Sequence, residues 1–138
     1  MRRCGSTARG SARDDRSHPE KTRILFVDDD PALLRALARS FRKDRSRWEM
    51  VFVLGGEAAL AALSADMFDV LVTDLNMPAV DGIAVLAAAK LRSPRTVRIM
   101  WTASSIDTAS IDADAVLAKP YDPDELRRFI ESALNSLK

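Results

Sequence analysis

The chain has 138 residues, the length of one ordinary domain, with 47% hydrophobic and 30% charged residues. Its 21 basic and 20 acidic residues give a net charge of +1, which argues against a dedicated nucleic-acid binder. With one cysteine, Cys4, and one histidine, His18, it cannot form an intrachain disulfide, and a zinc site rich in these residues or a Ser-His-Asp triad is disfavoured.

The N-terminal segment, residues 1–21, contains no Ile, Leu, Val, Phe, Tyr or Trp and carries six basic and three acidic residues. Such a segment cannot bury enough apolar area to offset its ordering entropy, so it is predicted to be disordered. It lacks the apolar core of a signal peptide, and no run of 18 apolar residues predicts a membrane span anywhere in the chain. The expected organisation is a disordered basic extension followed by one domain, residues 22–138, in the cytoplasm.

From residue 22 onward, short apolar runs alternate with helix-like segments. Strands are predicted over 23–27, 48–54, 69–73, 97–101 and 115–119, and helices over 31–43, 57–64, 83–91 and from about 123 to the end. Strands that are apolar on both faces and separated by helices indicate a parallel sheet covered on both sides. The predicted fold is therefore α/β, a doubly wound five-stranded parallel sheet flanked by helices.

The helix ends carry recognisable signals. Asp30 before Pro31 is expected to cap the first helix, and the run Asp122-Pro123-Asp124-Glu125 is a strong start for the last one. In the helix over 83–91, Ile83, Leu86 and Ala87 are predicted to face inward. Asp81-Gly82 is interpreted as a turn in which the glycine supplies a positive φ.

Polar residues gather where the predicted strands end. Asp28, Asp29 and Asp30 follow the first strand, Asp74 the third, Thr102 the fourth, and Lys119 the fifth. The carboxyl ends of parallel strands meet in one crevice, so these groups should lie together. Crowded carboxylates repel unless a cation neutralises them, and Mg²⁺ prefers such oxygen ligands. Acids, Mg²⁺, a hydroxyl and a lysine indicate phosphoryl transfer with an aspartate nucleophile, while Asp30 suits a helix cap better than a ligand.

Four motifs, VDDD, VLVTDLNMPAVDG, WTA and AKP, mark the ends of the first, third, fourth and fifth predicted strands in this order. Together they make residues 22–138 resemble the receiver domain of two-component response regulators, which has a flavodoxin-like fold. The resemblance implies that Asp74 is the phosphoacceptor and that a sensor histidine kinase or a histidine phosphotransfer protein is the donor. It also implies Mg²⁺ held by Asp28, Asp29, Asp74 and the backbone carbonyl of Asn76, with Thr102 as the switch hydroxyl and Lys119 as the partner of the phosphoryl oxygens.

The chain departs from the family pattern between the fourth and fifth strands. Only 16 residues separate Thr102 from Lys119, about five fewer than is usual in the family, so the family's fourth helix is expected to be shortened or missing. Three positions before the lysine, where the family often has an aromatic switch residue, this chain has Val116. The segment 103–113 is expected to be the most mobile part of the domain, and Asp112 and Asp114 are expected to be solvated loop acids.

The leading interpretation is a single-domain response regulator that signals through phosphorylation-dependent contact with an output protein, since no DNA-binding or enzymatic domain follows Ser136. It would not be a turnover enzyme, although it would be able to hydrolyse its own aspartyl phosphate. The alternative is a receiver-like adaptor that works without phosphorylation. A phosphatase of the haloacid-dehalogenase type is disfavoured, because Ala32 stands where its motif requires Thr or Val.

Overall fold

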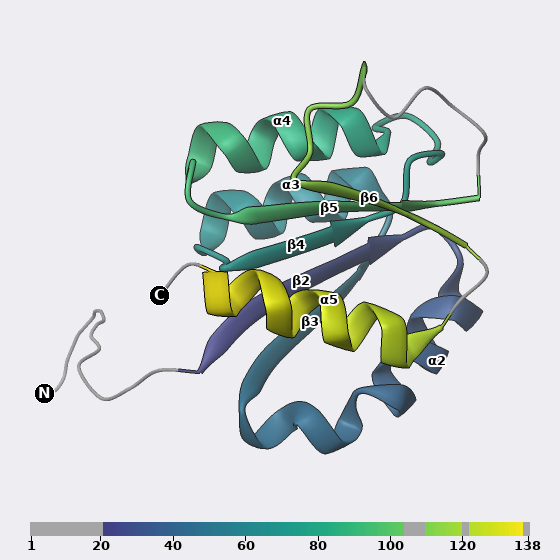
Figure 1. Cartoon of the computed structure of the whole chain (residues 1–138). Coiled ribbons are helices and arrows are strands. Elements are labelled where there is room, and N and C mark those ends of the chain that lie inside the picture. Colours follow the sequence, from purple (N-terminus) through teal and green to yellow (C-terminus); the bar gives the residue numbers. More distant parts are fainter. Residues whose placement is uncertain (1–20, 104–109, 120–121, 137–138) are drawn as a thin grey trace, which may run out of the picture.

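The computed structural model describes residues 21–103, 110–119 and 122–136. Five parallel strands form one sheet in the order β3-β2-β4-β5-β6, and helices lie on both of its faces (Figure 1). The strands are β2 (Thr22–Asp28), β3 (Trp48–Leu54), β4 (Val70–Thr73), β5 (Val97–Thr102) and β6 (Ala115–Ala118). The α-helices are α2 (Pro31–Ser40), α3 (Gly56–Ala65), α4 (Gly82–Arg92) and α5 (Pro123–Ser136), and a short 3₁₀ helix, η1, spans Arg42–Ser46. The predicted doubly wound parallel sheet is confirmed.

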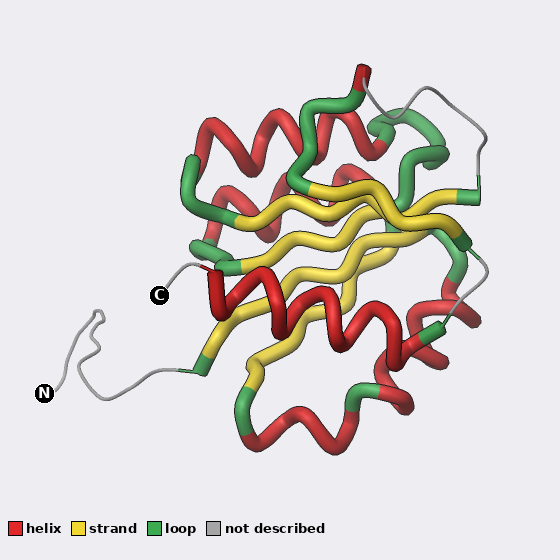
Figure 2. Tube along the Cα trace, viewed as in Figure 1, coloured by secondary structure: helices red, strands yellow, loops and turns green. Residues whose placement is uncertain are grey.

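The central strands are buried on both faces, which explains their unbroken apolar runs. Alternate residues of β2 point to opposite sides, so Ile24 and Phe26 join one core while Leu25 and Val27 join the other. The first core lies under α2 and α5, and the second lies under α3 and α4. Figure 2 shows the resulting layer of strands between helices.

Side chains cap α2 and α5 as their sequences predict. The Asp30 carboxylate accepts hydrogen bonds from the backbone N–H groups of Ala32 and Leu33, so the cap predicted for α2 is confirmed. Asp122 caps α5 in the same way, through the amides of Asp124 and Glu125. The Asp30 carboxylate is therefore engaged with the start of its own helix, which agrees with its interpretation as a cap.

The first predicted helix ends earlier than its apolar periodicity suggested. α2 stops at Ser40, and the chain continues as η1, where Asp44 is buried with only 4% of its surface exposed. Arg127 of α5 donates to Asp44 Oδ2 at 2.9 Å, and Arg47 donates to Oδ1 at 2.8 Å. This buried ion-pair network ties the end of the first helical segment to α5, and nothing in the helical periodicity signals it.

The inward face predicted for the helix over 83–91 was wrong in two of three residues. Leu86 is buried, but Ile83 is 51% exposed and Ala87 faces solvent. Val85 and Ala89 are buried instead. α4 is apolar around most of its circumference, so hydrophobicity alone could not identify its core face.

The connection between β5 and β6 has no α-helix in its described residues, 103 and 110–114, which agrees with a shortened or missing fourth helix. Arg98, buried in β5, donates to the backbone carbonyl of Asp112 and at 3.1 Å to its carboxylate. Lys90 pairs with the same carboxylate at 2.9 Å, and Asp114 accepts from the Arg98 amide. Asp112 and Asp114 are exposed, as predicted for solvated loop acids, and the structure adds that both are also partners of Arg98. The predicted mobility of the rest of 103–113 falls mainly on residues 104–109, which lie outside the described residues.

The disorder predicted for residues 1–21 also falls almost wholly outside the described residues and stays a prediction. Val116, at the position of the family's aromatic switch residue, is partly buried against the α3–α4 core.

Candidate functional site

The four strand ends singled out in the sequence meet at the carboxyl end of the sheet. Asp28 is the last residue of β2, and the amide of Asp74, just after β4, donates to the Val27 carbonyl at 3.0 Å. On the neighbouring strands, Thr102 ends β5, and its carbonyl accepts from the Lys119 amide at 3.0 Å. Parallel pairing in this register therefore brings the two acidic ends and the Thr102–Lys119 pair to the same crevice.

Asp28, Asp29 and Asp74 form a compact acidic cluster. One carboxylate oxygen from each lies within 4.8 Å of the others. Asp28 is 3% exposed and Asp74 8% exposed, whereas Asp29 faces solvent. The cluster therefore has two buried carboxylates at its base and one at its mouth, and among the described residues it is the group of acids that could hold a metal ion.

Backbone amides fix the two buried carboxylates. The Leu75 amide donates to Asp74 Oδ1 at 2.8 Å, and the Asp30 amide donates to Asp28 Oδ1 at 3.0 Å. Each bond joins a residue to its near neighbour in the chain, so it sets the side-chain direction locally. These amide donors were not anticipated from the sequence, because any residue type at position 30 or 75 except proline supplies the same N–H.

Lys119 is the cation that faces the cluster. Its Nζ lies 3.1 Å from Asp28 Oδ2 and 3.6 Å from Asp74 Oδ1. The same ammonium lies 5.7 Å from the ring centroid of Trp101, within the range of a cation–π contact. Lys119 is therefore held between the two acids and the aromatic ring of Trp101 in β5. The sequence had placed Lys119 and Trp101 on separate strands, and the structure brings them together.

The ionisation of Asp74 reflects these surroundings. Burial raises the pKa of the Asp74 carboxyl above its ordinary value, and the negative charge of Asp28 raises it further. The Lys119 charge and the Leu75 amide act in the opposite direction on this pKa but do not cancel the increase. Asp74 is thus a desolvated carboxylate whose charge is costly, the condition in which an added cation would stabilise the site most.

The loop after Asp74 is tightly packed against it. A Cβ atom added at Gly82 would lie only 2.1 Å from the Asp74 carbonyl oxygen. Positive φ among the described residues occurs at Gly55 and Ala79, so the prediction that Gly82 supplies a positive φ was wrong. Gly82 is the first residue of α4, Asp81 is its cap, and the glycine is needed because the helix start touches the backbone of the site.

The remaining predicted site residues are placed only in part. Thr102 is buried with 3% of its surface exposed at the strand end next to Lys119. Asn76 is exposed and lies two residues after Asp74. Their predicted roles, a switch hydroxyl and a carbonyl ligand, stay predictions.

The donor set fits Mg²⁺. All of the clustered atoms are carboxylate oxygens, the ligand type that a hard divalent cation prefers, and exposure at Asp29 leaves room for bound water. No histidine or cysteine lies among them, which disfavours softer metals.

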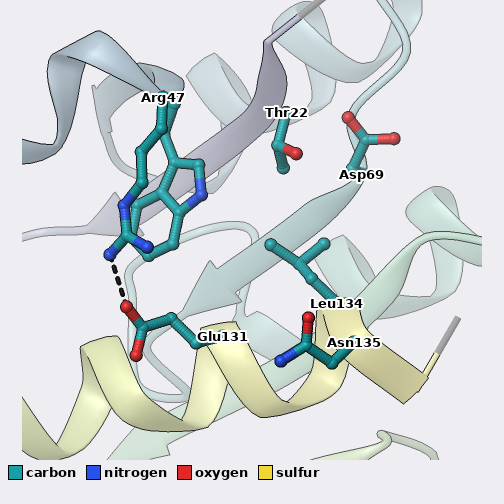
Figure 3. A pocket seen from close by; sticks show the side chains of 7 residues that line it. Thr22, Arg47, Asp69, Glu131, Leu134 and Asn135 are labelled. Carbon is teal, nitrogen blue, oxygen red and sulfur yellow. Dashed lines mark hydrogen bonds and ion pairs between the residues drawn. The ribbon is translucent and has the colours of Figure 1, made fainter. Parts of the chain in front are cut away.

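A separate hollow opens at the other end of the sheet (Figure 3). It is lined by Thr22, Arg47, Trp48, Asp69, Glu131, Leu134 and Asn135. Arg47 stacks on Trp48 at 4.0 Å and donates to Glu131 at 2.6 Å. The charges of Arg47 and Glu131, which line the hollow, are therefore already paired with each other. This hollow lies at the amino ends of β2 and β3, away from the acidic cluster, and its contacts link η1 to α5.

The sequence model of the response regulator receiver domain matches residues 24–131. The transcriptional regulatory protein ZraR of Salmonella typhimurium is 35% identical over 122 residues, which cover 83% of this chain but 26% of ZraR. A receiver domain protein from Methanospirillum hungatei superposes with a TM-score of 0.77 at 25% identity, covering 85% of this chain and 96% of that one. TrrA of Thermotoga maritima, solved with Mg²⁺ and beryllofluoride, gives a TM-score of 0.71 at 27% identity, covering 81% and 98%.

The match to ZraR shows that this chain spans about a quarter of that relative's length. None of the helices described in the structure is long and apolar enough to cross a membrane. The family match extends over most of the chain and includes every residue of the acidic cluster and Lys119. The chain therefore belongs to the response regulator receiver domain family of two-component signalling.

Proposed function

We propose that this protein accepts a phosphoryl group on Asp74 and signals through the phosphorylated form. Receiver domains are signalling modules that accept phosphoryl groups from histidine kinases, and they are not turnover enzymes. The observation that carries the assignment to Asp74 is the geometry of the crevice. Asp28 and Asp74 are both buried members of the acidic cluster near Lys119, but Asp74 follows β4, the central strand, and so lies between Asp28 at the end of β2 and Thr102 at the end of β5.

The transfer step has a simple balance. A carboxylate oxygen of Asp74 attacks the phosphorus of a phosphohistidine on the donor protein, a new O–P bond forms, and the N–P bond breaks. The histidine nitrogen leaves with the electron pair of that bond and takes up a proton. The chain needs no histidine of its own in this step, which agrees with the absence of histidine from the site.

The residues around Asp74 have distinct proposed roles. Asp28 and Asp29 would hold Mg²⁺ together with Asp74 and the Asn76 carbonyl, and the bound ion would neutralise the charge on the phosphoryl oxygens. Lys119 exchanges its contact with Asp74 for a contact with the phosphoryl group, since its ammonium is already within reach. Thr102, on the neighbouring strand end, would donate its hydroxyl to a phosphoryl oxygen.

The same site supports slow loss of the phosphoryl group. Water attacks phosphorus, the O–P bond to Asp74 breaks, and inorganic phosphate leaves while the carboxylate is regenerated. The phosphorylated form is proposed to act by contact with an output protein, and the donor to be a sensor histidine kinase or a phosphotransfer protein.

The test is a small phosphodonor. The protein is incubated with acetyl phosphate in the presence and absence of Mg²⁺, and its intact mass is measured. The expected result is the addition of one phosphoryl group that requires Mg²⁺ and is lost in Asp74→Asn. Asp81→Asn is the matched control, because Asp81 lies in the same region but caps α4, a role that asparagine also fills.

Two results would contradict the assignment. Labelling that persists in Asp74→Asn places the phosphoryl group elsewhere. A complete lack of labelling in the wild-type protein, with Mg²⁺ and a donor present, favours the phosphorylation-independent adaptor.

A further inference from the structure

α4 presents an apolar stripe to solvent. Ile83 is 51% exposed and Leu91 is 88% exposed, and Ala84 and Ala87 are exposed between them. Positions 83, 87 and 91 are spaced by four residues, so they follow one face of the helix. That face is opposite the buried residues Val85, Leu86 and Ala89. Ile83, Ala84, Ala87 and Leu91 therefore form an exposed apolar stripe, and the exposed polar side chains of α4, Lys90 and Arg92, lie at its carboxyl end.

The helices on the other face of the sheet differ. The exposed residues of α2 include Arg35 and Arg39, and those of α5 include Asp124, Glu125 and Arg128. Outward faces of this kind are ordinary for helices in contact with water. Large apolar side chains in a continuous stripe with small residues between them are typical of a surface that packs against another protein.

The two ends of the α3–α4 layer have opposite charge. At the amino end are the exposed acids Glu57, in the first turn of α3, and Asp81, the cap of α4. A Cβ added at Gly56 would meet the Val80 carbonyl at 2.1 Å, which shows that these two helix starts are in contact. At the carboxyl end of α4 are the exposed bases Lys90 and Arg92.

We infer that the outward face of α4 binds α4 of a second copy of this chain, antiparallel and across a two-fold axis that passes near Ala87. In this arrangement Ile83 of each copy packs against Leu91 of the other, because both lie four residues from Ala87. The small alanine at the axis lets the helix backbones approach closely. The basic end of each α4 then lies on the acidic end of the partner, and the two helix dipoles run in opposite directions.

Self-association fits these observations better than a different partner. The stripe is symmetric about Ala87, and the acidic and basic ends that flank it are complementary to their own inverted copy, as an isologous interface requires. Lys90 already pairs with Asp112 of its own chain, so Arg92 supplies the basic charge that is in no ion pair of this kind with the described residues. The inference does not depend on phosphorylation, since it uses α4 and the start of α3 and none of the proposed roles of Asp74, Thr102 or Lys119. Its test is therefore separable from the test of the proposed function.

The first experiment measures association of the full chain by sedimentation velocity over a range of concentrations. We expect a dimer with a dissociation constant on the order of 100 µM, as for a small interface. Ala87→Glu places two carboxylates at the axis and should weaken the dimer by about a hundredfold or more. Ala38→Glu, at an exposed position of α2, should leave it unchanged. Higher salt should weaken the wild-type dimer, because part of the attraction is between exposed charges.

The second experiment locates the axis. In a Cys4→Ser background, Ala87→Cys should form an intermolecular disulfide rapidly under mild oxidation, and Ala38→Cys should not. Circular dichroism checks that each variant is folded. A wild-type chain that stays monomeric up to about 1 mM overturns the inference. So does a dimer that Ala87→Glu does not weaken, or one in which Ala87→Cys cross-links no faster than Ala38→Cys.

Discussion

Lys119 neutralises the acidic cluster in the absence of a metal ion, and replacing it tests how the site balances its charges. Lys119→Met keeps a long unbranched side chain and removes the ammonium. Asp28 and Asp74 then face each other without the cation that lies 3.1 and 3.6 Å from them. We expect the metal-free variant to be less stable than the wild-type protein.

The size of the effect follows from the distances. At an effective dielectric constant of about 20, each attraction to Lys119 is worth about 5 kcal/mol and the repulsion between carboxylates within 4.8 Å about 3.5 kcal/mol. The Lys119 side chain is 20% exposed, so water screens these gross values and also solvates the acids once the lysine is gone. A net loss of about 1–3 kcal/mol is expected, which lowers the melting temperature by roughly 4 °C per kcal/mol.

The assay is thermal unfolding with EDTA and with millimolar Mg²⁺. Mg²⁺ should raise the melting temperature of both proteins by linkage. The increase should be larger in Lys119→Met, because the lysine charge no longer opposes binding of a divalent cation. Lys90→Met is the matched control, since Lys90 pairs with the exposed Asp112 outside the crevice.

The result that would refute this reasoning is an equal or smaller Mg²⁺ response in Lys119→Met than in the wild-type protein. Lys119 and the metal ion would then not share the same carboxylates, and the assignment of Asp28 and Asp74 as ligands would fail with it.

Three further predictions concern stability. Asp74→Asn should stabilise the metal-free protein at pH 7, because the pKa of Asp74 is raised in the folded state and its ionisation therefore lowers the free energy of unfolding as pH rises. The stability gain over wild type, measured by urea unfolding, should vanish in acid, where Asp74 is protonated; a gain that is the same at both pH values would contradict this origin. Asp44→Ala removes the buried carboxylate from Arg127 but leaves its bonds to Asp124 and to the Ser40 carbonyl, so it should cost about 1.5–3 kcal/mol in the same assay. A loss below about 0.5 kcal/mol would show that the Asp44–Arg127 pair contributes little. Gly82→Ala forces a Cβ against the Asp74 carbonyl and should lower both the melting temperature and the rate of labelling by acetyl phosphate. Gly55→Ala is the control: its added Cβ meets no atom within 4 Å, so with a φ of +88° it should cost only about 1–3 kcal/mol of backbone strain and should not slow labelling. Equal labelling rates for the two variants would contradict the packing argument.

The sequence was sufficient to predict the sheet and the composition of the crevice. Strand runs such as VLVT, apolar on both faces, have few alternatives to a buried parallel strand, and the carboxyl ends of such strands meet by topology alone. This is why Asp28, Asp29, Asp74 and Lys119 could be grouped before any contact was known.

The errors and omissions come from contacts that no local pattern encodes. α4 is apolar on nearly every side, so the core face could be chosen only by packing, and Ile83 was assigned to the wrong side. Arg98 lies inside a strand that reads as apolar, and its pairing with Asp112 spans 14 residues. The positive-φ interpretation of Gly82 failed because glycine serves two purposes, backbone freedom and close approach, and the sequence does not distinguish them.

The position of Trp101 gives the protein an optical readout of its own site. The chain has two tryptophans, and Trp48 lies at the opposite edge of the sheet, stacked under Arg47 at 4.0 Å. Trp101 is the one close to the Lys119 ammonium, at 5.7 Å from its ring. Movement of Lys119 toward a phosphoryl group would change the electric field at Trp101 and would leave the surroundings of Trp48 unchanged, so Trp48 adds only a constant background. In a Trp48→Phe variant, fluorescence emission would therefore follow occupancy of the crevice in real time, without an attached dye or a labelled donor.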